Sequence, residues 1–226
     1  MSAPKIEPAR VAIFGSYHQG EAVIGKILEL QKQYPDFIRL VGIATDDPRN
    51  NCVSPQRRIW RLANPSDYDM IPQIAAQNNV PVWTGIVKGD DFFQEFSERW
   101  KPDVCYMATF GQLVPARIFD RSRLGFFNFH PAVDREWPSY AGGDPFGRMI
   151  AAKEPHCSVA MHEIDETFDN GKLVAFSPPV PIGPSDTVLS MYKRTSPPTA
   201  ELVHWHLGEL SIVPPRPNYH PRREPT

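Results

Sequence analysis

Short apolar runs alternate along this chain with segments of helical periodicity, and this alternation constrains the fold more than any other feature. Strand-like runs occupy 10–15, 38–45, 81–85, 103–109 and 126–130. Helical spacing of apolar residues marks 21–33, 68–78 and 90–100. Parallel strands need crossover connections, which usually contain a helix. We therefore expect an α/β fold with a Rossmann-like, mostly parallel sheet and helices on both faces.

The pattern changes after residue 154. The runs 156–164 and 172–182 read as two longer strands joined by a turn-rich stretch, so we expect them to pair antiparallel as a hairpin at one edge of the sheet. A helix is expected to begin at Ser185 as N-cap, to break at Pro197 and Pro198, and to resume to about Leu210.

The chain divides into one domain over 1–210 and a proline-rich, basic tail over 211–226. A tail of this composition is expected either to be loosely held or to dock as an extended strap.

Charge and cysteine usage exclude several classes of protein. A formal net charge of −2 over 226 residues gives no general attraction to nucleic acid or to anionic membranes. The three cysteines are odd in number and form no CxxC pattern, which is typical of reduced thiols rather than of a metal site. We see neither a signal peptide nor an apolar window of ~20 residues. We expect a cytoplasmic protein with no bound metal and no membrane or nucleic-acid partner.

The segment FFNFHPAV at 126–133 carries the strongest chemical signal. Because strand side chains alternate, Asn128 and His130 point to one face. The amide can donate a hydrogen bond to a developing oxyanion, and the imidazole can move a proton near neutral pH. Pro131 is expected to end the strand, which leaves His130 at its carboxyl end, where ligands bind in open α/β sheets. A hydrogen-bonded structural histidine is the alternative.

Asp169 is a third candidate. It lies in the turn-rich stretch DETFDNGK at 165–172. A carboxylate there could orient His130 and stabilise its charged form.

Four segments carry a resemblance to a known family. ATFGQLVP at 108–115, GFFNFHPAV at 125–133, YAGGDPFGRMIAAKE at 140–154 and HEIDETFDNGKLVAF at 162–176 occur in the same order as in the N10-formyltetrahydrofolate-dependent formyltransferases. The chain resembles that family over roughly residues 10–185. The resemblance implies the formyltransferase fold, with 1–210 as catalytic domain, and formyl transfer from N10-formyltetrahydrofolate to an amine.

The resemblance also implies site residues. The catalytic constellation falls on Asn128, His130 and Asp169. The pterin end of the folate would bind, largely through backbone groups, beside Phe110, Gly111, Gln112, Leu113, Val114, Ile164, Asp165 and Glu166.

Two departures bear on the acceptor. The family usually continues its His-Pro differently from HPAVDREWPSYAGGDP, with an arginine where this chain has Ala141. The first turn, GSYHQGE, lacks the phosphate loop of the glycinamide ribonucleotide enzymes, and it lacks the GxGxxG of NAD-binding folds.

The acceptor is expected to be a nucleotide-linked amino sugar. Enzymes that act on methionyl-tRNA carry a further β-barrel domain, and formyltetrahydrofolate hydrolases carry an N-terminal regulatory domain, whereas the sugar N-formyltransferases of lipopolysaccharide biosynthesis match in length. Glycinamide ribonucleotide, methionyl-tRNA and a non-catalytic folate- or nucleotide-binding module are the alternatives. Family members often dimerise, so a homodimer is also expected.

A nucleotide-linked sugar needs cations for its diphosphate and an apolar platform for its base. The candidates for acceptor binding are His18, Arg57, Arg58, Trp60, Arg135, Trp137 and Tyr140. The alternative is that the arginines are solvated loop charges and that Trp137 packs against the core.

Overall fold

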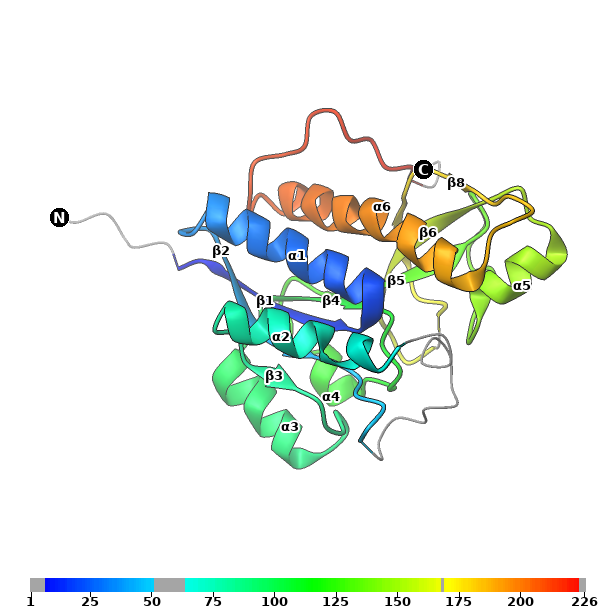
Figure 1. The fold of residues 1–226 in the computed structure, drawn as a ribbon. Helices are drawn as coiled ribbons and strands as arrows, with labels where there is room; N and C mark the ends of the chain where they lie inside the picture. The colour runs from blue at the N-terminus through cyan, green and yellow to red at the C-terminus, as the bar shows by residue number, and fades with distance from the viewer. Residues whose placement is uncertain (1–6, 51–63, 168, 224–226) are drawn as a thin grey trace.

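The computed structural model describes residues 7–50, 64–167 and 169–223 (Figure 1). An eight-stranded sheet has the order β3-β2-β1-β4-β5-β6-β7, with β8 paired to β6. The strands are β1 (Ala9–Gly15), β2 (Ile38–Ala44), β3 (Val82–Trp83), β4 (Val104–Ala108), β5 (Phe126–Ala132), β6 (His156–Glu163), β7 (Leu173–Phe176) and β8 (Val180–Pro181). Strands β1 to β5 are parallel, and β6 to β8 join antiparallel. The expected α/β fold with an antiparallel edge is confirmed.

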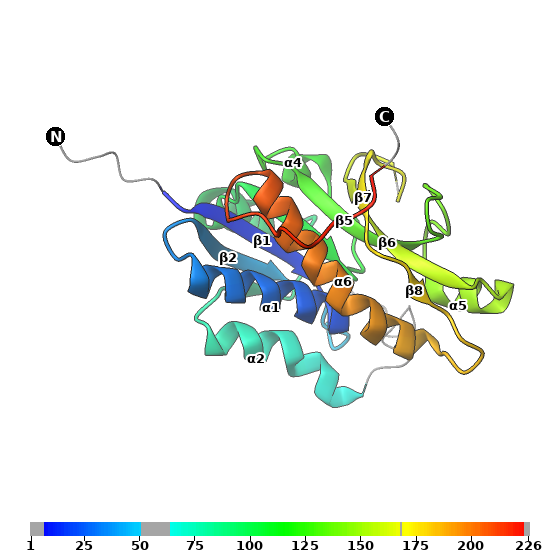
Figure 2. The ribbon, with the colours of Figure 1, turned by 90° about the horizontal axis from the view of Figure 1, so that it is seen from above.

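Helices cover both faces of the sheet (Figures 1 and 2). One face carries α1 (Tyr17–Gln33), α2 (Met70–Gln77), which follows the 3₁₀ turn η2 (Pro65–Asp69), and α6 (Val188–Glu209). The other carries α3 (Asp90–Gln94), its π-helical extension η3 (Glu95–Trp100) and α4 (Ala116–Phe119). The remaining helix, α5 (Pro145–Ala152), packs beside α6 and β5. Burial on both faces explains why the strands read as continuous apolar runs.

The sequence predicts that Pro131 ends strand β5, and this prediction is wrong. Strand β5 continues to Ala132, and Pro131 pairs with Val159 of β6. Strand β4 pairs with β5 only as far as Phe129, so Pro131 has an edge-like position where a missing N–H is tolerated.

The predicted break at Pro197 and Pro198 is also wrong, because both prolines lie inside α6. The hydroxyls of Thr195, Ser196 and Thr199 donate to carbonyls of the preceding turn at 2.8, 2.7 and 2.8 Å. The packing of α6 along α1 holds the helix together despite a proline cost of about 3 kcal/mol each.

The same helix begins two residues later than predicted. Thr187, not Ser185, is its N-cap. The Thr187 hydroxyl accepts from the Ser190 N–H at 3.1 Å, and the Ser190 hydroxyl accepts from the Thr187 N–H at 2.9 Å. This reciprocal capping box fixes where the helix starts.

The described part of the tail, 211–223, docks as a strap. Ile212 and Val213 enter the core. The Arg222 backbone then exchanges hydrogen bonds with Phe176 at 2.7 and 3.0 Å, so the tail covers the edge of β7. Among the described residues, no helix is long and apolar enough to cross a membrane.

Candidate active site

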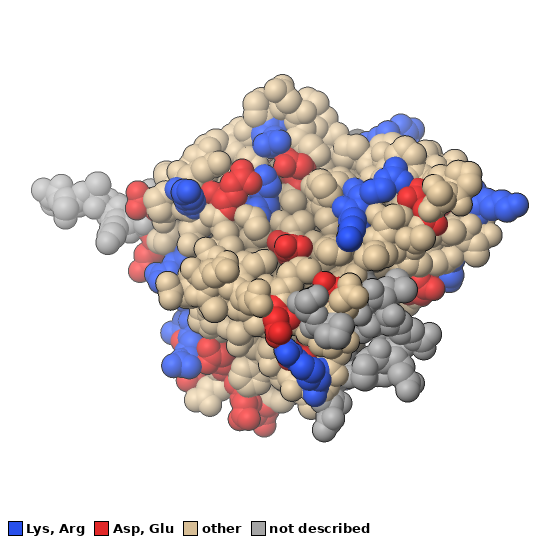
Figure 3. All heavy atoms as spheres, viewed as in Figure 1, with Lys and Arg blue, Asp and Glu red and all other residues tan. Residues whose placement is uncertain are grey.

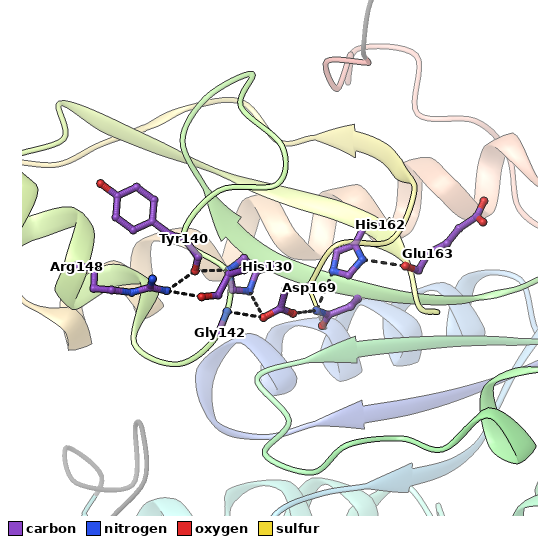
Figure 4. A network of polar contacts seen from close by, with 9 residues as sticks. His130, Tyr140, Gly142, Arg148, His162, Glu163 and Asp169 are labelled. Atoms are coloured by element: carbon purple, nitrogen blue, oxygen red, sulfur yellow. Dashed lines mark hydrogen bonds and ion pairs between the residues drawn. The ribbon is translucent and has the colours of Figure 1, made fainter. Parts of the chain in front are cut away.

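The structure brings the three predicted catalytic residues together (Figure 4). Strand β5 presents Asn128 and His130 on one face, and the loop between β6 and β7 brings Asp169 beside them. The Asp169 carboxylate accepts from Asn128 Nδ2 at 3.1 Å and lies 3.4 Å from His130 Nδ1. The three residues are only 6, 6 and 9 % exposed. They form one buried polar cluster at the carboxyl end of β5.

A fourth member, His162, lies directly opposite Asn128 in the β5–β6 pairing. Its Nδ1 donates to the Glu163 carbonyl at 2.9 Å, because a carbonyl can only accept. Its Nε2 therefore accepts from Asn128 Nδ2 at 3.0 Å. Burial lowers the pKa of His162 to about 4, which keeps the ring neutral at pH 7. The sequence analysis does not name His162 as a site residue although it opens the segment 162–176, since its place opposite Asn128 depends on the register between two strands.

The neutral His162 ring fixes the orientation of the Asn128 amide. One N–H of Nδ2 is directed to Asp169 and the other to His162. For Asn128 to donate to a substrate oxygen, one of these bonds must be exchanged. An unpaired buried acceptor costs about 1–3 kcal/mol, so a substrate must supply a hydrogen bond at least as good.

The protonation of His130 also follows from its partners. Its Nε2 lies 3.0 Å from the Tyr140 carbonyl, so Nε2 carries a proton. Its Nδ1 faces Asp169, and a second proton at Nδ1 would form an imidazolium paired with that carboxylate.

A cavity opens beside this cluster, and its wall includes most of the residues expected to bind folate. Phe110, Gln112, Leu113, Val114, Ile164 and Asp165 line it. Four of these side chains are apolar, which suits a flat ring system. The Gln112 amide is already bonded to Gly85 O at 3.1 Å and to Val87 N at 3.0 Å, so it borders the cavity as a fixed group.

The structure places the other two folate candidates apart from that wall. The Gly111 N–H donates to Asp46, and a Cβ on Gly111 would lie 2.7 Å from Asp46 Oδ2. Among the described residues that line the cavity, neither Gly111 nor Glu166 is present. No cluster of His, Cys, Asp and Glu within the described ranges could hold a metal ion.

None of the acceptor candidates that the structure describes lines the cavity. Arg57, Arg58 and Trp60 lie outside the described residues. In the first turn of α1, His18 Nδ1 lies 3.6 Å from Glu21 Oε2. Arg135 is exposed in the loop after β5.

Trp137 and Tyr140 contact the protein itself. The Trp137 indole donates to Gly171 O at 2.9 Å and lies over His162 with ring centroids 4.6 Å apart. The Tyr140 hydroxyl donates to Glu154 at 2.6 Å. The described wall of the cavity includes neither of them, and it contains instead Gln19, Thr109 and Tyr192, none of which the sequence analysis names as a candidate.

Comparison with known proteins matches residues 52–204 to the family model described as Formyl transferase. Among curated proteins, the methionyl-tRNA formyltransferase of Thermus thermophilus is 30% identical over 128 residues, covering 57% of this chain and 41% of that protein. The enzyme of Clostridioides difficile is 29% identical over 145 residues, covering 64% and 43%. The chain thus spans about two-fifths of the length of these relatives.

Solved structures share the fold. Glycinamide ribonucleotide transformylase 1 from Geobacillus kaustophilus aligns with a TM-score of 0.62 and 19% identity over 87% of this chain and 99% of that one. A sugar N-formyltransferase from a Shewanella species gives 0.63 and 18% over 96% and 74%. A formyltetrahydrofolate deformylase from Pseudomonas syringae gives 0.64 and 14% over 91% and 63%.

Proposed function

Because this chain belongs to the formyl transferase family, whose members take their formyl group from N10-formyltetrahydrofolate, we propose that it transfers this group to the primary amine of a nucleotide-linked amino sugar. The family match confirms the resemblance found in the motifs. The observation that carries the proposal is the convergence of Asn128, His130 and Asp169 on the wall of one cavity.

The donor folate would occupy the half of the cavity bordered by Phe110, Leu113, Val114 and Ile164. Its pterin ring would pack on these apolar side chains and bond to backbone groups beside them. The formyl carbon would then lie next to Asn128 and His130.

In the reaction, the acceptor amine attacks the formyl carbon and forms a new C–N bond. The formyl oxygen becomes negative in the tetrahedral intermediate, and breaking the bond to N10 releases tetrahydrofolate, with a proton returned to N10. His130 accepts the proton that the amine loses, and Asp169, whose Oδ2 lies 3.4 Å from His130 Nδ1, stabilises the imidazolium that results.

Asn128 would stabilise the oxyanion by turning one N–H from His162 to the formyl oxygen. The bond to Asp169 keeps the amide in place during this exchange. Because a charged oxygen is a stronger acceptor than a neutral imidazole, the exchange becomes favourable only as the oxygen gains charge. Such an interaction stabilises the transition state more than the bound substrate.

The overall alignment with a sugar N-formyltransferase over 96% of the chain supports a sugar acceptor. Asp144, Asp165 and Asp169 line the cavity and would attract the amino group that each of the candidate acceptors carries. Figure 3 shows Lys and Arg interleaved with Asp and Glu over the visible face. Methionyl-tRNA is the second candidate acceptor, because curated relatives at about 30% identity are methionyl-tRNA formyltransferases.

The test is an acceptor panel. N10-formyltetrahydrofolate is incubated with the protein and with nucleotide-linked 3-amino and 4-amino sugars, glycinamide ribonucleotide or initiator methionyl-tRNA. Tetrahydrofolate release and the mass of the formylated product are measured. We expect turnover with an amino sugar. Turnover with methionyl-tRNA alone would favour the second candidate, and folate binding without turnover would contradict both.

A further inference from the structure

We propose that Arg148 is a positioning residue for this site, acting through the backbone of residues 139–144, which we call the support loop. The inference rests on the proposed function for its kinetic consequence. Its structural basis is independent of which amine is formylated.

The support loop contributes two backbone groups to the catalytic cluster (Figure 4). The Tyr140 carbonyl accepts from His130 Nε2 at 3.0 Å. The Gly142 N–H donates to Asp169 Oδ2 at 2.9 Å. One loop therefore holds both members of the His130–Asp169 pair, and a shift of the loop would change their separation and their angle.

The conformation of this loop is costly to maintain. Tyr140 and Asp144 have φ of 51° and 56°, in the left-handed region, and Gly142 has φ of 90°. For residues other than glycine this region costs about 1–2 kcal/mol each. Surrounding contacts must therefore hold the loop in place.

Arg148 supplies those contacts. Its Nη2 donates to the carbonyls of Tyr140 and Ala141, the latter at 2.8 Å. Its guanidinium carbon lies 5.5 Å from the centre of the Tyr140 ring. The Tyr140 carbonyl thus accepts from both Arg148 and His130. A planar guanidinium can bridge adjacent carbonyls and stack on an aromatic ring at once, which a lysine ammonium cannot do.

Arg148 is itself held on a rigid element. Helix α5 buries Phe146 and Met149 completely. The Asp144 side chain caps the helix by accepting from the Gly147 N–H at 3.1 Å. The arginine therefore connects a packed helix to the loop that carries the two catalytic contacts.

The kinetic test compares Arg148→Ala and Arg148→Lys with Arg223→Ala. Arg223 is the matched control, because its guanidinium carbon also lies close to an aromatic ring, 5.0 Å from the centre of the Trp205 ring. Unlike Arg148, it forms an ion pair, with Glu209. We expect Arg148→Ala to lower kcat by about 30-fold, as a small misplacement of catalytic groups does, with the KM for folate changed less than about twofold. Added guanidinium ion should restore part of the activity that Arg148→Ala loses. The Arg148→Lys variant should retain little more activity than Arg148→Ala.

A second readout does not depend on turnover. ¹⁵N spectra of the imidazole rings, assigned with His130→Asn, report the protonation of His130. We expect Arg148→Ala to alter the His130 Nε2 signal and Arg223→Ala to leave it unchanged. This result in a protein that formylates no amine would support the positioning role while the proposed function fails.

Wild-type kcat and an unchanged His130 signal in Arg148→Ala would overturn the inference. So would a loss of activity accompanied by a large fall in Tm and no rescue by guanidinium, because that result would indicate general destabilisation.

Discussion

Two buried histidines occupy similar surroundings and differ in where their hydrogen bonds lead. His162 on β6 and His206 on α6 are both removed from solvent, and burial lowers the pKa of each to about 4. His206 Nδ1 lies 2.9 Å from the Tyr106 hydroxyl, and its ring packs on Phe127 within the core between α6 and the sheet. His162 instead accepts from Asn128, beside the cavity. A perturbed pKa therefore identifies burial, and the neighbouring residues identify function.

The largest contrast is expected between the catalytic cluster and the core histidine. His130→Asn should lower kcat by about 10²–10⁴-fold, the scale of a lost general base, while leaving the unfolding free energy nearly unchanged. His206→Asn should do the reverse, with kcat kept and stability reduced. Steady-state kinetics and urea unfolding of both variants check this. Similar losses of kcat in the two variants would break the distinction.

Asp169→Asn is expected to have the next largest effect. It removes the charge beside His130 and keeps the shape, so kcat should fall by about 100-fold with little change in folate binding. An unchanged kcat would point to Asp165 or Glu166 as the partner instead.

The two buried histidines, His162 and His206, should also make the free energy of unfolding depend on pH. A folded-state pKa of about 4, against 6.5 for the unfolded group, means that the unfolded chain binds more protons between these values. The stabilisation is complete above pH 6.5 and is lost as pH falls toward 4, by about 3 kcal/mol for each ring. Urea unfolding between pH 4 and 7 measures this slope.

Single variants separate the two rings. His206→Leu should flatten the slope and keep kcat. His162→Leu should flatten it equally and also lower kcat by about 10-fold, because the Asn128 amide loses an acceptor that orients it. An unchanged kcat in His162→Leu would assign this ring to the core as well.

The sequence predicts the parts of the fold and site that neighbouring residues determine. It does not predict the parts that depend on contacts between residues far apart in the chain. Local alternation indicates the sheet, and the two-residue spacing of Asn128 and His130 indicates their shared face. The prolines of α6 mislead, because tertiary packing against α1 outweighs a local preference. His162 and Arg148 lie within segments that carry the family resemblance, but the sequence does not indicate their roles, since one depends on strand register and the other on a loop that folds back onto its own helix.

For Trp137 and Tyr140, the sequence suggested a role that the structure does not show. Their residue types suggested ligand contacts, yet the loop turns one over His162 and the other toward Glu154. In an irregular loop, no periodicity in the sequence encodes where a side chain points.

The smallest effect is expected at the strap. Arg222 pairs with Asp134 on the loop after β5, and both side chains are partly accessible. Arg222→Ala should lower the unfolding free energy by about 1 kcal/mol or less and leave kcat unchanged. Chemical denaturation and the acceptor assay check this, and a large loss of kcat would show that the strap supports the site.

A single-turnover experiment tests the central claim most directly. Protein in excess over N10-formyltetrahydrofolate is mixed with a nucleotide-linked amino sugar, and tetrahydrofolate and N-formylated product are followed by rapid quench. The wild type should form both in equal amounts, and His130→Asn and Asn128→Ala should each slow this step by about 100-fold or more while still binding folate. Formation at the wild-type rate in either variant would contradict the assignment of catalysis to this cluster.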